Sequence, residues 1–170
     1  PEIALTPQLV SRFRARFGDH VAVIHSAQTA RARANMHAEL LAGRLRVAIG
    51  ARSALFAPVP NLRLIIVDEE HDPSFKQEEG VRHQARDMAL LRGHLAGATV
   101  VLGSATPSLE SFVRASEKKL LRLDLPERAA RTALLPKVTT VDLKRVGKGP
   151  GEERKLTLPL HRAIEETLGR

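Results

Sequence analysis

Residues 64–72 read Leu-Ile-Ile-Val-Asp-Glu-Glu-His-Asp, and this stretch decides the fold of the 170-residue chain. Four consecutive branched apolar residues without polar alternation predict a strand buried on both faces. The run ends abruptly in four carboxylates with His71 among them. Crowded carboxylates repel one another, and in open α/β sheets ligands bind outside the carboxyl ends of the strands. The stretch therefore predicts a ligand-binding edge of a sheet.

A divalent metal carrying a nucleotide phosphate would supply the missing positive charge, because hard cations take oxygen ligands. Asp68 suits the role of holding magnesium, directly or through water. Glu69 would then orient or deprotonate the water that attacks a γ-phosphate. A simpler alternative is a solvated acidic turn. A metal-dependent nuclease using Asp68, Glu69 and Asp72 is disfavoured, because neighbouring residues at a strand end point to alternate sides.

The composition favours a polyanionic partner. Lys and Arg number 27 against 19 Asp and Glu, which gives a net charge of +8. The absence of cysteine excludes a disulfide framework and a thiolate zinc site. No apolar run of 18 residues is present, so no membrane span is expected. The amino end is neither a signal peptide nor a start with methionine, and we expect the sequence to be an internal piece of a longer protein.

Strands and helices alternate along the sequence. Apolar runs predict strands over 20–24, 45–49, 64–67 and 99–102, and 3.6-residue periodicity predicts helices over 7–17, 29–41, 83–95 and 157–168. We also expect Thr106 to cap a short helix with Pro107 at its first position. Two short alternating runs are predicted within 120–143, followed by a flexible break over 147–151. The alternation predicts a parallel sheet with right-handed crossovers.

Polar groups follow each predicted strand. They are His25-Ser26, residues 50–53, residues 68–71 and Ser104-Ala105-Thr106. The carboxyl ends of parallel strands share one edge, so we expect these groups to converge there. His71 could form a hydrogen bond to Ser104 or Thr106 and tie one strand end to its neighbour. Taken alone, the Ser-Ala-Thr segment fits a helix-capping turn equally well.

These motifs resemble a known family. Asp68-Glu69-Glu70-His71 resembles the Walker B, or DExH, box of superfamily 2 helicases, and Ser104-Ala105-Thr106 resembles their third motif. Five blocks resemble the primosomal protein N′ family, the PriA-type replication-restart DNA helicases: 1–8, 50–58, 68–72, 76–80 and 103–111. The resemblance covers nearly the whole chain. It implies a RecA-like α/β motor that couples ATP hydrolysis to 3′→5′ unwinding of DNA.

The resemblance also implies roles for individual residues. Catalysis would fall to Asp68, Glu69 and His71, with Asp68 on the magnesium, and nucleotide contact or coupling to Glu70, Ser104, Ala105 and Thr106. The family's motifs Ia and Ib line the path of single-stranded DNA, and here they correspond to Pro1, Glu2, Thr6, Gln8, Gly50, Arg52 and Ser53. By the same resemblance, a loop over 72–86 would report DNA binding to the ATP site, and its expected DNA contacts are Phe75, Lys76, Arg82, His83 and Arg86. His83 stands where the family pattern has tyrosine.

Other family features are missing from the sequence. No Gly-x-x-x-x-Gly-Lys-Ser/Thr is present, and Gly147-Lys148-Gly149 lacks the hydroxyl residue that would complete a P-loop. The family's cysteine-rich zinc insert has no counterpart, so this chain offers no zinc ligands of that kind. We therefore expect residues 1–125 to be a partial first lobe without its first strand and P-loop. Residues 126–170 would be a linker and the beginning of a second lobe.

The implied partners are single-stranded and forked DNA, ATP with Mg²⁺, primosome proteins and the single-stranded-DNA-binding protein, all in the bacterial cytoplasm. The isolated chain is expected to be inactive, because a P-loop supplies most of the phosphate cradle. A hypothesis of a different class is a non-catalytic DNA-binding or primosome-assembly scaffold. Hydrolysis of ATP stimulated by DNA would separate the two.

Overall fold

The computed structural model describes residues 7–25, 27–127, 138–142, 144–146 and 156–169. The chain forms two compact units, Pro1–Arg122 and Leu123–Arg170. The predicted division after residue 125 lies close to their boundary, and the assignment of the units to helicase lobes stays a prediction. Pro1–Thr6 and the break over 147–151 lie outside the described residues.

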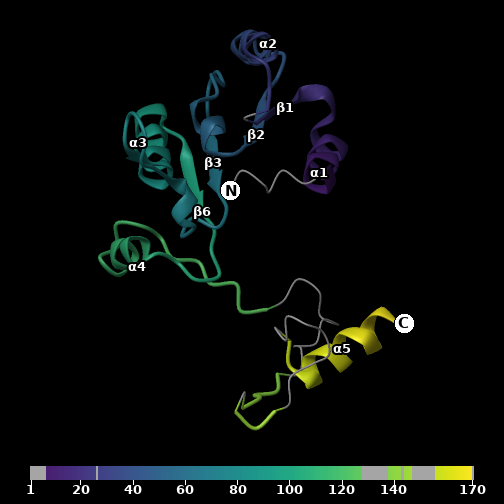
Figure 1. Cartoon of the computed structure of the whole chain (residues 1–170). Coiled ribbons are helices and arrows are strands. Elements are labelled where there is room, and N and C mark those ends of the chain that lie inside the picture. The colour runs from purple at the N-terminus through teal and green to yellow at the C-terminus, as the bar shows by residue number, and fades with distance from the viewer. Residues whose placement is uncertain (1–6, 26, 128–137, 143, 147–155, 170) are drawn as a thin grey trace. The chain divides into compact units, whose positions relative to one another are not determined.

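Helices and strands alternate in the first unit, as predicted (Figure 1). The elements are α1 (Pro7–Phe17), η1 (Gly18–His20), β1 (Val21–Ile24), α2 (Ala30–Leu41), β2 (Val47–Gly50), η2 (Arg52–Phe56), β3 (Leu64–Val67), η3 (Pro73–Phe75), β4 (Lys76–Gln77), β5 (His83–Gln84), α3 (Ala85–Ala96), β6 (Thr99–Leu102) and α4 (Leu109–Ser116). The second unit contains α5, Leu158–Leu168, close to the predicted bounds. The described part of 120–143 forms no strand.

The predicted parallel strands occur as two separate pairs. β1 pairs with β2, with Val21 opposite Val47, and β3 pairs with β6, with Leu64 opposite Thr99. Among the described strands no ladder joins the two pairs into the continuous sheet that we expected. A third, antiparallel pair joins β4 to β5. This hairpin delays the start of α3 to Ala85, two residues later than predicted.

The core of the first pair lies between β1, α2 and the segment after β2. Ile24 and Leu40 are fully buried, and Ala22 and Ala57 complete the cluster. Thr29 caps α2, since its Oγ1 accepts a hydrogen bond from the backbone N–H of Ala32 at 3.2 Å. Apolar burial of this kind fixes the strand ends that carry the polar residues.

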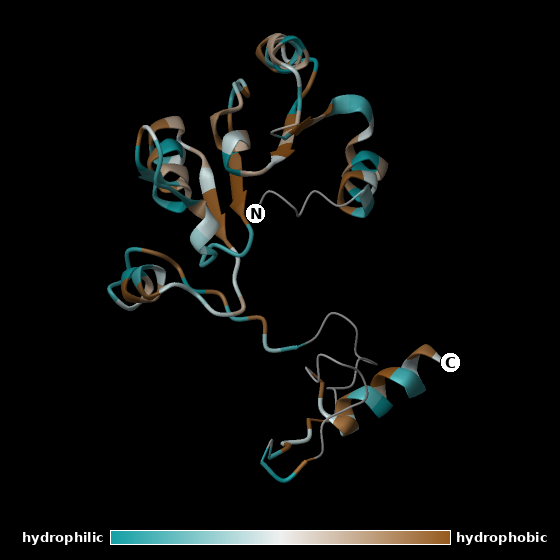
Figure 2. Cartoon of the chain, viewed as in Figure 1, coloured by the Kyte–Doolittle hydropathy of each residue, from teal (hydrophilic) through white to brown (hydrophobic). Residues whose placement is uncertain are grey.

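The second pair is covered on one face by α3. Gly93 of α3 lies so close to β6 that a Cβ atom there would be 2.2 Å from Cγ2 of Val100. The other face of β3 is open, because Leu64 is 50% and Ile66 62% exposed, and Figure 2 shows that the residues of this strand are hydrophobic. The prediction that β3 is buried on both faces is therefore wrong for the described residues, because none of their helices covers that side.

The cap of α4 also differs from the prediction. Ser108, not Thr106, is the N-cap, and its side chain accepts a hydrogen bond from the N–H of Ser111 at 3.3 Å. Thr106 instead directs its hydroxyl to His71. None of the described helices has the length and apolar character needed to cross a membrane.

Candidate active site

Two acidic residues lie directly after β3, where the chain turns sharply. The Oδ1 of Asp68 accepts a hydrogen bond from the N–H of Glu69 at 3.1 Å, and both side chains are exposed. Glu69 has φ +50°, a left-handed conformation that costs a non-glycine residue about 1–2 kcal/mol. The turn thus holds two solvent-facing carboxylates at the strand end.

Backbone hydrogen bonds lock this turn to the end of β6. The N–H of Gly103 donates to the carbonyl of Val67 at 2.8 Å, and the N–H of Glu70 donates to the carbonyl of Gly103 at 3.0 Å. A Cβ atom on Gly103 would lie 3.4 Å from Oδ1 of Asp68. The Asp68 carboxylate therefore lies directly beside the end of β6.

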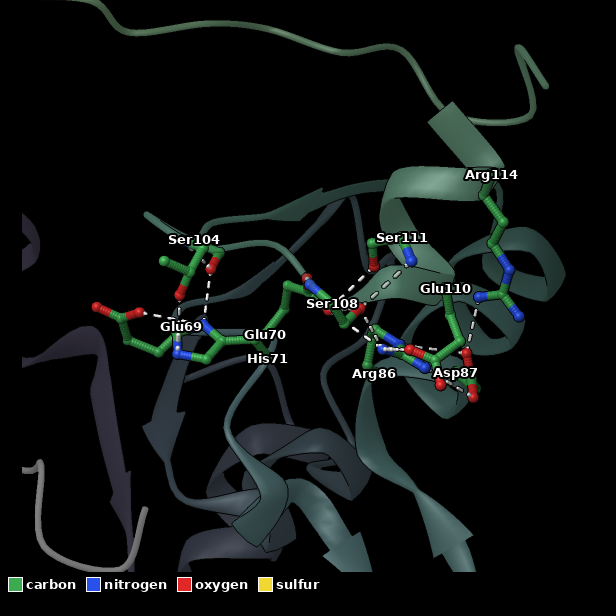
Figure 3. Close-up of polar contacts among 11 residues, drawn as sticks. Glu69, Glu70, His71, Arg86, Asp87, Ser104, Ser108, Glu110, Ser111 and Arg114 are labelled. Carbon is green, nitrogen blue, oxygen red and sulfur yellow. Dashed lines mark hydrogen bonds and ion pairs between the residues drawn. The ribbon is translucent and has the colours of Figure 1, made fainter. Parts of the chain in front are cut away.

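His71 bridges the two strand ends, as we expected from the sequence (Figure 3). Its Nδ1 lies 2.7 Å from Oγ of Ser104, and its Nε2 lies 3.4 Å from Oγ1 of Thr106. The same Nδ1 is 3.5 Å from Oε2 of Glu69. Ala105 lies between the two hydroxyl residues and is exposed. The imidazole therefore contacts both the acidic turn and the loop after β6.

Glu70 points the other way, into a buried polar network. Its Oε1 accepts from the N–H of Ser108 at 2.7 Å, and its Oε2 accepts from the hydroxyls of Ser108 and Ser111 at 2.9 and 3.0 Å. Arg86 Nη1 lies 3.3 Å from the same Oε2. Glu70 is 1% and Arg86 4% exposed. Burial raises the pKa of Glu70, but the bonds from Ser108, Ser111 and Arg86 outweigh burial and hold the pKa below its ordinary value.

The predicted DNA contacts fall into two groups in the described residues. Gly50 is the last residue of β2, and Arg52 and Ser53 lie in η2 just after it. Nη1 of Arg52 donates to the carbonyl of Lys76 in the β4–β5 hairpin at 2.7 Å. A Cβ atom on Gly50 would be 2.4 Å from the carbonyl oxygen of Ile24, so packing alone requires glycine there. Gln8 lies on α1 and is exposed.

The second group lies on and beside the hairpin. Lys76 and Arg82 are exposed, and Lys76 pairs with Glu78 at 2.9 Å. Lys76, Arg82 and His83 line one open hollow. The ring of His83 meets the ring of Phe56 edge to face at 5.6 Å, a contact that the sequence did not reveal. Phe75 is half-buried, whereas Arg86 is enclosed, and this burial favours a structural role for Arg86 over the predicted contact with DNA.

Asp68 could supply one carboxylate to a metal ion whose remaining ligands are water and phosphate oxygens. Among the described residues, no three His, Asp or Glu side chains gather to hold a metal ion. Magnesium that accompanies nucleotides typically takes one or two carboxylates and fills its other positions with water and phosphate oxygens. The exposed Asp68 carboxylate suits that role.

Comparison with known proteins places the chain in a family. A model of the DEAD/DEAH box helicase family matches residues 1–114, which include the acidic turn and the Ser104–Thr106 loop. The chain belongs to the DEAD/DEAH box helicase family. The parallel strand pairs and flanking helices agree with the predicted RecA-like α/β class.

Three curated relatives share the name "Replication restart protein PriA". The protein from Bacillus subtilis is 41% identical over 170 residues, which are 100% of this chain and 21% of the relative. The protein from Chlamydia pneumoniae is 54% identical over 131 residues, 76% of this chain and 18% of the relative. That from Synechocystis is 48% identical over 149 residues, 85% of this chain and 18% of the relative. The chain thus spans about a fifth of their length, and the predicted resemblance to PriA-type helicases is confirmed.

Proposed function

We propose that this chain is part of an ATP-dependent DNA helicase that unwinds DNA in the 3′→5′ direction during replication restart. The observation that carries the proposal is the bridge from His71 to Ser104 and Thr106. This bridge joins the acidic turn to the neighbouring strand end, which a solvated acidic turn would not require. The family match and the names of the relatives support the same activity.

In the proposed mechanism each residue of the strand end has one task. Magnesium bound with ATP would neutralise the phosphate charge, and Asp68 would hold it. Glu69 would orient the attacking water and accept its proton. His71 would keep the loop of Ser104 and Thr106 in contact with that turn. The phosphate cradle must come from outside these 170 residues, because they contain no P-loop motif. The 170 residues alone are therefore expected to be inactive.

The proposed partners are single-stranded and forked DNA, with primosome proteins and the single-stranded-DNA-binding protein, in the bacterial cytoplasm. The net charge of +8 supports contact with a polyanion. The exposed Lys76 and Arg82 beside the hairpin would contact the phosphate backbone, which positions a protein on DNA without reading sequence.

The test uses the full-length protein that contains this chain. ATP hydrolysis is measured with and without single-stranded DNA, and unwinding is measured on forked duplexes with a 3′ or a 5′ tail. The proposal predicts hydrolysis stimulated by DNA and unwinding in one polarity. DNA binding without hydrolysis would favour the scaffold hypothesis instead. The nuclease hypothesis has no supporting group of ligands among the described residues.

A further inference from the structure

The side chain of Glu70 lies in the acidic turn but faces away from the exposed carboxylates. It is enclosed where β3, α3 and α4 meet, and Figure 3 shows it directed toward Ser108, Ser111 and Arg86. A buried carboxylate and a buried guanidinium are costly unless each is paired and fully hydrogen-bonded. Here the carboxylate takes four hydrogen bonds, from the N–H of Ser108, the hydroxyls of Ser108 and Ser111, and Arg86 Nη1. Such an arrangement indicates that the position of this group matters.

The carboxylate of Glu70 fixes the far end of the loop that contacts His71. The near end is held by the N–H of Glu70, which donates to the Gly103 carbonyl. The middle is held by His71, through Ser104 and Thr106. The far end is held at Ser108, whose N–H and hydroxyl both donate to the Glu70 carboxylate. Glu70 is therefore hydrogen-bonded to both ends of this loop, at Gly103 and Ser108, and His71 contacts the residues between them.

Arg86 connects the same carboxylate to the hairpin. It is the second residue of α3, which begins directly after β5. Besides Glu70 it contacts Ser108 Oγ at 2.5 Å and Glu110 Oε2 at 3.5 Å. The β4 strand of the hairpin accepts the hydrogen bond from Arg52 at Lys76. Arg52 is thus hydrogen-bonded to the hairpin, the chain itself joins β5 to Arg86, and polar contacts join Arg86 to Glu70 and the loop.

We propose that Glu70 and Arg86 are a buried positioning pair that sets the loop of Ser104 and Thr106 against His71 and links it to the β4–β5 hairpin. This inference rests on the proposed function. Glu70 does not touch nucleotide in this role and Arg86 does not touch DNA. When DNA displaces the hairpin, Arg86 transmits that movement to the Glu70 carboxylate. The pair thereby makes hydrolysis at Glu69 responsive to DNA.

The experiment compares DNA-stimulated with DNA-independent ATP hydrolysis in the full-length protein. The variants are Glu70→Gln, which keeps an acceptor for the Ser108 N–H but removes the charge, Arg86→Met, and the two combined. We expect the ratio of stimulated to unstimulated kcat to fall at least tenfold in each single variant. The double variant should be no worse than either single one, since both act through one contact.

The control is Lys119→Ala. It breaks an exposed ion pair just beyond α4, from Lys119 to Glu117 at 2.7 Å, that includes neither Glu70 nor Arg86 nor any of their partners. Its stimulation ratio should stay within twofold of the parent protein. If the Glu70 and Arg86 variants are insoluble, the stimulation ratio of Ser108→Ala tests the proposal instead, because this variant deletes the hydroxyl that lies between the two charged groups. A purely structural role would lower both rates together with the melting temperature and leave their ratio unchanged.

The outcomes separate this inference from the proposed function. An unchanged ratio in soluble Glu70→Gln and Arg86→Met, or in Ser108→Ala, would overturn the positioning pair while leaving the helicase proposal intact. A parent protein that hydrolyses no ATP in the presence of DNA would overturn both. A selective loss of stimulation in the Glu70 and Arg86 variants, with the ratio retained in Lys119→Ala, is the result expected.

Discussion

At the scale of single residues, Glu69 combines an exposed carboxylate with a left-handed backbone, φ +50°. Strained conformations of this kind persist at functional sites because the surrounding structure imposes them. Glycine adopts this conformation without a Cβ penalty. We expect Glu69→Gly to stabilise the 170-residue chain by up to about 1 kcal/mol in urea denaturation. Glu69→Gln, which retains the Cβ, is the matched control and should change the free energy of unfolding little. A destabilised Glu69→Gly would contradict the strain at this residue.

The buried Glu70 makes a prediction for acid stability. Its folded-state pKa is held below the ordinary value of about 4.3, so its contribution to stability is present above that pH. The contribution is lost as the pH falls through the lower, folded-state pKa. Urea denaturation between pH 7 and 3 should therefore show a steeper acid loss for the parent chain than for Glu70→Gln. Asp72 and Asp87 also have lowered pKa values, but they are present in both proteins and cancel in the difference. Parallel curves would contradict an ionised, buried Glu70.

At the scale of elements, apolar pattern predicted the strands well and the polar contacts only in part. The bounds of β3 and β6 match the predicted 64–67 and 99–102, because unbroken apolar runs end abruptly in polar residues. The bridge from His71 was predicted because parallel strand ends share an edge. The cap at Ser108 was missed, although serine is a preferred N-cap residue, because Thr106 offers the same chemistry and is followed by a proline, which is favoured at the first helical position.

The hairpin and the buried network could not be predicted from local pattern. β4 and β5 have two residues each, too few for a period of two to show. The Glu70–Arg86 pair joins residues that are brought together only when α3 packs against β3. Four acidic residues lie close together between positions 68 and 72, and the sequence alone does not show which of their side chains faces the interior.

The contact of α3 with β6 gives a test of element packing. Alanine normally stabilises a helix interior by about 1 kcal/mol relative to glycine. At Gly93 the added Cβ would lie 2.2 Å from Val100 Cγ2 and 3.2 Å from the carbonyl of Ala98, so the helix or the Val100 side chain must move. We expect Gly93→Ala to destabilise the chain by about 1–3 kcal/mol. His94→Ala, at an exposed position of the same helix, should be within about 0.5 kcal/mol of the parent. Stabilisation by Gly93→Ala in urea denaturation would show that helix and strand are not in close contact.

At the scale of the whole molecule, the excess of positive charge predicts that DNA binding depends on salt concentration. Binding dominated by phosphates releases counterions and weakens steeply as salt rises. We expect weak binding of the 170-residue chain to single-stranded DNA, measured by fluorescence anisotropy, to fall about tenfold or more between 50 and 200 mM salt. Lys76→Ala and Arg82→Ala should weaken binding to all sequences equally, whereas Arg114→Ala serves as a charge-matched control. Affinity that is independent of salt, or restricted to one base sequence, would argue against a phosphate-tracking surface.

We propose that the turn after β3 carries out ATP hydrolysis in the full-length protein. The most direct measurement is the DNA-stimulated ATPase rate of Glu69→Gln, with ATP binding and thermal stability measured on the same preparation. Glutamine keeps the size and polar contacts of Glu69 but cannot accept the proton, so kcat should fall about 10²–10⁴-fold while binding and fold are retained. Hydrolysis by Glu69→Gln near the parent rate would contradict the assignment of this strand end as the catalytic motif.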